Sequence, residues 1–186
     1  MPAPLMPREE VVRRLLEVFR GHGFDGASLA QLSKASGLGK SSLYHYFPGG
    51  KEDMARAVLE EVERWMAAHV LAPLAAPGTP ARRLARMVKA LDELYDGGRA
   101  ACLLGNMLVG DARRLFRKPL KDAFGAWIEA LASVARDAGM SATPARLWAE
   151  ETVLSIEGAL VLARGLDDPE PFRRVLRRLP GTLARS

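Results

Sequence analysis

The chain has 186 residues, a net charge of +5 at pH 7 and a single cysteine, Cys102. This length allows one or two small domains with a sizeable core. One cysteine excludes an intrachain disulfide, and no apolar run reaches the ~18–20 residues that a membrane span needs. Because the opening MPAPLMPREE also lacks the basic and then apolar pattern of a signal sequence, we expect a cytoplasmic protein with no membrane partner.

The first part of the chain predicts three helices. Residues 1–7 contain three prolines, so we expect an irregular arm there, after which apolar residues at helical spacing predict a helix from Arg8 to Arg20. Two short helical patterns follow, Leu29 to Ala35 and Lys40 to Phe47. Gly37 lies between them, and glycine readily takes the left-handed conformation of a helix end. Two short helices joined by such a turn predict a helix-turn-helix, whose second helix can enter the DNA major groove.

The outer face of the second short helix favours nucleic acid over a merely solvated surface. No acidic residue occurs from Ser28 to Lys51, and residues 1–51 hold seven Lys and Arg against four Asp and Glu. Hydroxyl and cationic groups without carboxylates suit a phosphate backbone. We expect Lys40, Ser41 and Ser42 to face base edges or adjacent phosphates. The residues expected mainly to hold phosphates are Ser28, Tyr44, His45, Tyr46 and Lys51.

The same stretch resembles the DNA-binding domain of the TetR family of bacterial regulators. Leu43-Tyr44-His45-Tyr46-Phe47 matches the family pattern directly, and Ser28 stands for its threonine. Gly39 replaces a usual serine, and Ser41 replaces a usual glycine. The turn Pro48-Gly49-Gly50 is one residue longer than the commonest version, as in the subgroup that contains the LmrA and YxaF regulators. The resemblance implies three N-terminal DNA-binding helices and about six C-terminal helices for ligand binding and dimerisation.

The rest of the chain continues the helical pattern, without strand alternation or repeats. A helix from Lys51 to Leu71 is too long for the small N-terminal domain alone, and a proline-rich linker follows over residues 73–81. Further helices are expected over residues 80–95, 111–138 (with a possible bend at Pro119), 144–164 and 168–179, with a short apolar segment over residues 101–109. We therefore predict an all-α protein of about nine helices. Its expected domains are a DNA-binding domain, residues 1–50, and a ligand-binding and dimerisation domain, residues 51–186.

Large apolar residues of the second domain are candidates for an effector pocket. Each is more simply explained as core, but Met and Trp as a set suit an adaptable apolar pocket, and the family resemblance implies one here. The candidates are Trp65, Met87, Leu91, Tyr95, Met107, Phe124, Trp127 and Trp148.

The segment 144–164 is apolar on nearly every side, so we expect it to be buried on two fronts, one of them against another subunit. The residues expected at a dimer interface are Leu154, Gly158, Val161, Leu162, Phe172 and Leu176.

No catalytic or metal-binding pattern is visible. The three histidines are far apart and lack metal-ligand spacing, and Cys102 is best explained as a small buried apolar residue. We expect neither an enzyme nor a cofactor. The sequence favours a homodimeric repressor that binds a near-palindromic operator in double-stranded DNA and is released by a small apolar effector. The alternative is a helical small-molecule-binding or interaction protein with a vestigial helix-turn-helix.

Overall fold

The structure is a computed structural model that describes residues 6–183. Within this range every regular element is a helix, which confirms the all-α prediction. The helices form two compact units. The first comprises the chain up to Arg64 together with Leu103–Leu120, and the second comprises Trp65–Cys102 and the chain from Lys121 onward. In the described part of the chain no helix is both long and apolar enough to cross a membrane.

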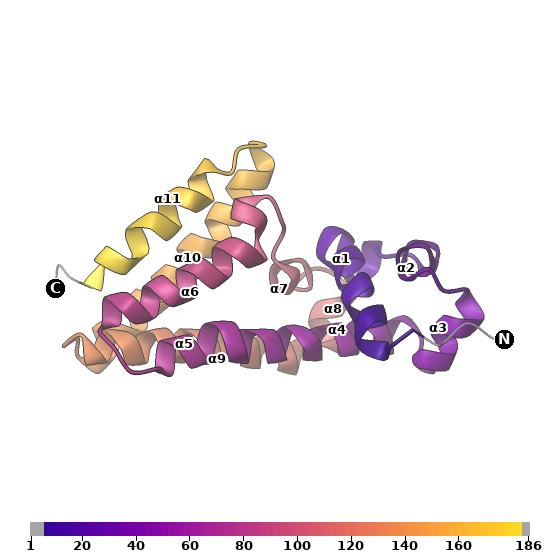
Figure 1. Ribbon diagram of the computed structural model, residues 1–186, viewed down its shortest axis with the longest axis horizontal. Coiled ribbons are helices and arrows are strands. Elements are labelled where there is room, and N and C mark those ends of the chain that lie inside the picture. The colour runs from indigo at the N-terminus through magenta and orange to yellow at the C-terminus, as the bar shows by residue number, and fades with distance from the viewer. Residues whose placement is uncertain (1–5, 184–186) are drawn as a thin grey trace. The chain divides into compact units, whose positions relative to one another are not determined.

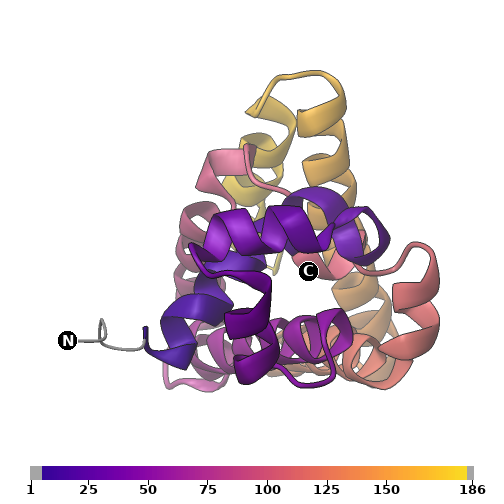
Figure 2. The same cartoon turned by 90° about the vertical axis from the view of Figure 1, so that its right-hand side faces the viewer.

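The first unit is built on helices from both of its segments (Figures 1 and 2). They are α1 (Arg8–Gly26), α2 (Leu29–Ser36), α3 (Lys40–Tyr46), most of α4 (Lys51–Met66), α7 (Leu103–Asn106) and α8 (Asp111–Leu115). Their apolar faces meet in a core that includes Leu15, Phe19, Leu32, Leu43, Phe47 and Phe116. The α2–α3 pair is the predicted helix-turn-helix, and its inner residues Leu43 and Phe47 are buried as expected.

The first helix does not end at Arg20 as predicted. Helical structure continues to Gly26, with an interruption at Gly23, whose φ is 66°. A side chain at Gly23 would place its Cβ only 3.0 Å from the backbone oxygen of Asn106. Gly23 therefore bends the chain beside α7 instead of ending the helix.

The second unit contains the remaining helices. They are the π-helix η1 (Ala67–Leu71), α5 (Ala72–Ala75), α6 (Pro80–Leu94), the 3-10 helix η2 (Asp96–Gly98), most of α9 (Arg117–Asp137), α10 (Ala142–Gly165), α11 (Glu170–Arg178) and the 3-10 helix η3 (Leu179–Gly181). Thr79 caps α6 because its hydroxyl accepts from the backbone N–H of Arg82. The core of this unit includes Leu84, Met87, Leu91, Trp127, Leu131 and Phe172.

Three predicted boundaries differ in the structure. The helix expected from Lys51 to Leu71 changes at Met66 into the π-helix η1, and part of the expected linker forms α5. The helix expected over 111–138 is broken at Phe116, which is buried and packs edge-on against Phe24 with ring centroids 5.4 Å apart. Pro119 lies in the first turn of α9, where proline is tolerated. Asp168 is not the first residue before α11, but its carboxylate accepts from the N–H of Glu170.

The predicted boundary at residue 50 separates a DNA-binding domain from a ligand-binding and dimerisation domain. It concerns function and stays a prediction. The compact units reflect packing, and they place the later segment Leu103–Leu120 with the N-terminal helices.

Candidate nucleic-acid interface

The N-terminus of α2 is held by a reciprocal cap. The Ser28 hydroxyl accepts from the N–H of Gln31 at 3.2 Å, and the Gln31 side chain accepts from the N–H of Ser28 at 2.9 Å. Both residues thus satisfy backbone donors that the first turn of a helix leaves unpaired. Ser28 remains exposed, so its predicted phosphate contact stays a prediction alongside this capping role.

The turn between α2 and α3 is fixed by serine hydroxyls that the sequence analysis did not single out. Ser36 is buried, and its Oγ donates to Leu32 O at 2.8 Å and accepts from the N–H of Leu38 at 3.3 Å. The Ser33 Oγ donates to Leu38 O at 2.6 Å. Arg14 of α1 donates to Ser36 O at 3.2 Å, beside the left-handed Gly37. These bonds make the turn a defined connection, so α3 is presented in one orientation.

The exposed face of α3 carries only groups that can donate hydrogen bonds. Leu43 anchors the helix in the core, while Lys40, Ser41, Ser42 and His45 are exposed. Tyr44 is 45% exposed, and its ring lies against the glycine turn, where a Cβ on Gly50 would come within 3.2 Å of the ring. Gly50, which has no side chain, therefore leaves room for the Tyr44 ring. Ammonium, hydroxyl, imidazole and phenol groups on one helix face suit phosphates and base edges.

Two residues predicted to hold phosphates have other partners. The Tyr46 hydroxyl donates to Met6 O at 2.6 Å, so its one proton already ties Met6 to α3. The structure thus gives Tyr46 a different role from the one predicted. The Lys51 ammonium donates to Phe24 O at 2.9 Å and to Ala27 O at 3.1 Å, and lies 4.5 Å from the Phe24 ring centroid. Because one of its three protons remains, a phosphate contact by Lys51 stays a prediction.

The predicted effector residues fall into separate groups. Met87, Leu91, Tyr95 and Trp127 are buried together in the second unit, where the indole N–H of Trp127 donates to the Met87 sulfur at 3.5 Å. Trp65 stacks on His69, with ring centroids 4.9 Å apart, and Phe124 is half-buried. Met107 is buried in the first unit, so the structure does not group it with the others.

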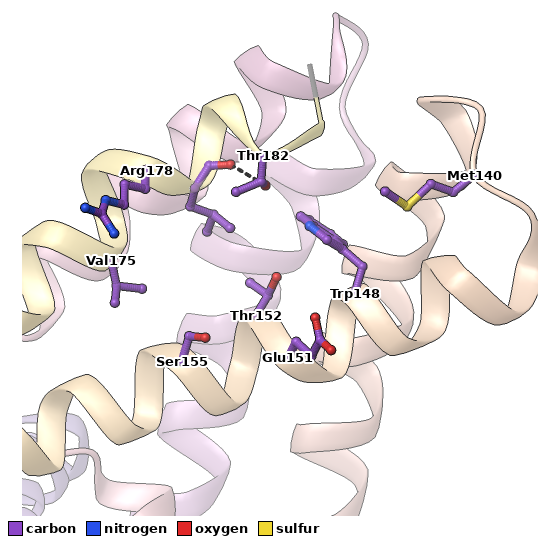
Figure 3. Close-up of a pocket in the computed structure, with 9 residues that line it drawn as sticks. Met140, Trp148, Glu151, Thr152, Ser155, Val175, Arg178 and Thr182 are labelled. Atoms are coloured by element: carbon purple, nitrogen blue, oxygen red, sulfur yellow. Dashed lines mark hydrogen bonds between the residues drawn. The ribbon is translucent and has the colours of Figure 1, made fainter. Parts of the chain in front are cut away.

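Trp148 lines an open pocket of about 430 Å³ between α10 and α11 (Figure 3). Glu151, Thr152 and Ser155 of α10 face Val175 and Arg178 of α11 across it. Only Trp148 among these residues was predicted from the sequence, because helical spacing does not reveal which helices meet to form a groove.

The predicted dimer residues divide into exposed and buried ones. Leu154, Val161 and Leu162 on α10 are exposed, and so is Gly158 between them. The expectation for Phe172 and Leu176 is wrong, because both are buried within the chain. Phe172 packs edge-on against Tyr95, with ring centroids 5.7 Å apart.

No group of three His, Cys, Asp or Glu side chains in residues 6–183 is arranged to hold a metal ion. The three histidines thus give no sign of a metal centre in that range.

Comparisons with known proteins agree with these two regions of the chain. Residues 12–58 match the family model described as bacterial regulatory proteins, tetR family. Residues 80–178, more than half of the chain, match the model described as transcriptional regulator LmrA/YxaF-like, C-terminal domain.

Similar full-length proteins include the HTH-type transcriptional regulator LmrA of Bacillus subtilis, which is 25% identical over 96% of this chain and 97% of its own. The uncharacterized HTH-type regulator YxaF of the same organism is 22% identical, over 93% of each chain.

Among solved structures, a TetR transcriptional regulator from Legionella pneumophila superposes with a TM-score of 0.83, at 22% identity, covering 98% of this chain and 99% of its own. The regulator CifR, in a cysteine mutant complexed with a 26-base-pair operator, superposes with a TM-score of 0.79 at 22% identity, covering 98% and 99%. Taken with the matching family models, these likenesses show that the chain belongs to the TetR family of transcriptional regulators, in its LmrA/YxaF-like branch, and not to a family of enzymes.

Proposed function

We propose that this regulator is a repressor that binds a near-palindromic operator as a homodimer and is released by a small, mostly apolar effector. The observation that carries the proposal is the exposed face of α3, where Lys40, Ser41, Ser42, Tyr44 and His45 lie on a helix that serine hydroxyls orient. Such a face can place donors at base edges and phosphates together.

The dimer is supported by the outward face of α10. Leu154, Val161 and Leu162 are 69%, 71% and 56% exposed, and they share one helix with Gly158, which permits close approach. A contiguous exposed apolar patch is typical of a protein interface. In a symmetric dimer two copies of α3 would read half-sites one helical turn apart, ~34–36 Å.

The effector is supported by the composition of the second unit. Its core places the flexible, polarizable Met87 against Trp127, and methionine adapts readily to ligands of different shape. The effector must bind the DNA-free form more tightly than the DNA-bound form, since only differential affinity shifts an equilibrium. Operator DNA must then weaken effector binding by the same factor.

Selection of bound DNA from random sequence tests the DNA-binding part directly. We expect the wild-type protein to enrich a sequence with two inverted half-sites. Ser42→Ala should change the preferred bases, whereas the control Lys121→Ala, an exposed residue of the second unit, should leave them unchanged. Enrichment of no sequence by wild type would contradict the proposal and favour a ligand-binding protein with a vestigial helix-turn-helix.

A further inference from the structure

A carboxyl group without a charge partner lies inside the second unit. Glu157 projects from α10 with its Oε1 atom buried and without a hydrogen-bond partner. Its side chain contacts Cys102 through a hydrogen bond, and Cys102 in turn accepts one from the Tyr95 hydroxyl at 3.4 Å. Phenol, thiol and carboxyl thus form a row of polar groups, and Tyr95 in this row directly follows α6, whose buried apolar stripe includes Met87 and Leu91.

No cation offsets this carboxyl within the described residues. Burial raises the pKa of Glu157, and the hydrogen bond from Cys102 offsets that rise only in part; no charged side chain contributes. A buried acceptor that lacks a donor has a free-energy cost that a suitable ligand can remove.

Arg83, on the same face of α6, provides the contrast. It is only 8% exposed and its Nε atom lacks a partner, but its guanidinium is paired with Asp137 at 2.6 Å. Since Arg83 has a counter-ion and Glu157 has none, the uncompensated group in this unit is an acceptor that favours a positively charged donor.

We propose that Glu157, with Cys102 and Tyr95, is the polar anchor of the effector site, and that the effector class is an amphiphilic amine with an apolar body. This inference rests on the proposed function only in assuming that the second unit binds an effector. The protonated amine would donate to Oε1, while the apolar body would displace side chains that now pack on the α6 stripe, where Met87 and Leu91 are 0% and 1% exposed. A charge-assisted hydrogen bond in a buried site is stronger than one between neutral groups.

The proposal predicts a specific proton linkage. Burial raises the pKa of the Glu157 carboxyl in the empty site, so at any pH below that raised pKa an ammonium ion that binds there displaces the carboxyl proton. The affinity for the amine should therefore rise with pH until the pH passes the raised pKa of Glu157. A neutral alcohol of the same shape displaces no proton, so its affinity should not change over this range.

Isothermal titration calorimetry with three matched probes tests the proposal: 1-naphthylmethylamine, 1-naphthylmethanol and 1-naphthoic acid. We expect the wild-type protein to bind the amine about 10-fold or more tightly than the alcohol, and the acid most weakly. Glu157→Gln keeps the shape but cannot ionise, so it should remove the preference for the amine and its proton release while leaving the alcohol affinity nearly unchanged.

Glu151→Gln is the matched control, because Glu151 lies on the same helix but lines the α10–α11 pocket. Loss of amine preference in Glu151→Gln, equal amine binding by wild type and Glu157→Gln, or no binding of any probe would each overturn the inference. Operator affinity, measured with and without the amine, separates this from the proposed function. An amine that binds through Glu157 without changing operator affinity would support the site and contradict release by ligand.

Discussion

Helices α3 and α10 both expose one face, but the two faces are chemically opposite. The exposed positions of α3 carry ammonium, hydroxyl, imidazole and phenol groups, while those of α10 include Leu154, Val161 and Leu162. Each helix is anchored on its other side by buried apolar residues such as Leu43 and Ile156. The difference teaches that burial alone does not distinguish a nucleic-acid face from a protein face; the chemistry of the exposed side does.

The largest expected effect is on assembly. Val161→Glu places a charge on a residue that is 71% exposed in the single chain, so the fold should be retained. In a dimer the same charge would be buried without a partner, which is strongly destabilising. We expect a folded monomer, with operator affinity reduced at least 100-fold because only one half-site contact remains. Analytical ultracentrifugation and operator titration measure both.

Val109→Glu is the control for this prediction. Val109 is 72% exposed and belongs to the first unit, whereas α10 belongs to the second. A dimeric Val161→Glu protein, or a monomeric Val109→Glu protein, would assign the interface to a different surface.

The α3 face should respond in two distinguishable ways. Tyr44→Ala should weaken binding to all DNA sequences alike, because a phosphate contact carries no sequence information. If Lys40 contacts a base, Lys40→Ala should change the base preference, at ~1–3 kcal/mol per lost bidentate contact. If Lys40 contacts a phosphate instead, Lys40→Ala should reduce the magnitude of the slope of log affinity against log salt concentration by about 0.9. Competition binding at several salt concentrations gives both values. Unchanged affinity in both variants would remove α3 from the interface.

The next effect concerns coupling between effector and operator. Trp65 is half-buried beside His69 where α4 gives way to η1. Trp65→Ala should leave operator affinity without ligand nearly intact and change the ligand response, which for a coupling of ~1–3 kcal/mol is a 5–150-fold change in operator affinity. The measurement is operator affinity with and without a bound effector. An unchanged ligand response in Trp65→Ala would show that this residue does not take part.

The smallest expected effect is a pH dependence of stability. The raised pKa of Glu157 means that the folded state binds this proton more tightly than the unfolded state. Its contribution to stability is present below the ordinary value of 4.5 and is lost as pH rises through the folded pKa. Glu157→Gln should therefore become more stable relative to wild type as pH rises, and each kcal/mol would appear as about 2–4 °C in Tm for a chain of this size. A constant difference across pH would show that Glu157 ionises normally.

The sequence predicted the parts of this molecule whose structure is set locally. Ser28, Gly37 and the spacing of Leu43 and Phe47 depend on neighbours within one or two helical turns, and the predicted helix-turn-helix is confirmed. The errors arose where distant segments meet. The break at Phe116 depends on Phe24, the bend at Gly23 depends on Asn106, and the burial of Phe172 depends on Tyr95.

The candidate site shows the same limit. Residue types and charge indicated the face of α3, but not that Tyr46 and Lys51 use their donors on Met6, Phe24 and Ala27. Glu157 gave no signal at all, because one glutamate on an apolar helix does not reveal whether a counter-ion reaches it. Such roles depend on partners 20 or more residues away in sequence, which periodicity does not report.

The π-helix η1 has a consequence for how this gene can change in length. A π-turn holds one more residue than an α-turn, so a single-residue deletion within Ala67–Leu71 can be absorbed by conversion to α-helix, with the faces of the flanking helices kept in place. The same deletion inside the α-helical part of α4 would rotate everything beyond it by about 100°. Deletion scanning with thermal unfolding as the readout should therefore find one tolerant position along this helix, at Ala67 or Ala68, and intolerance in the turns before it.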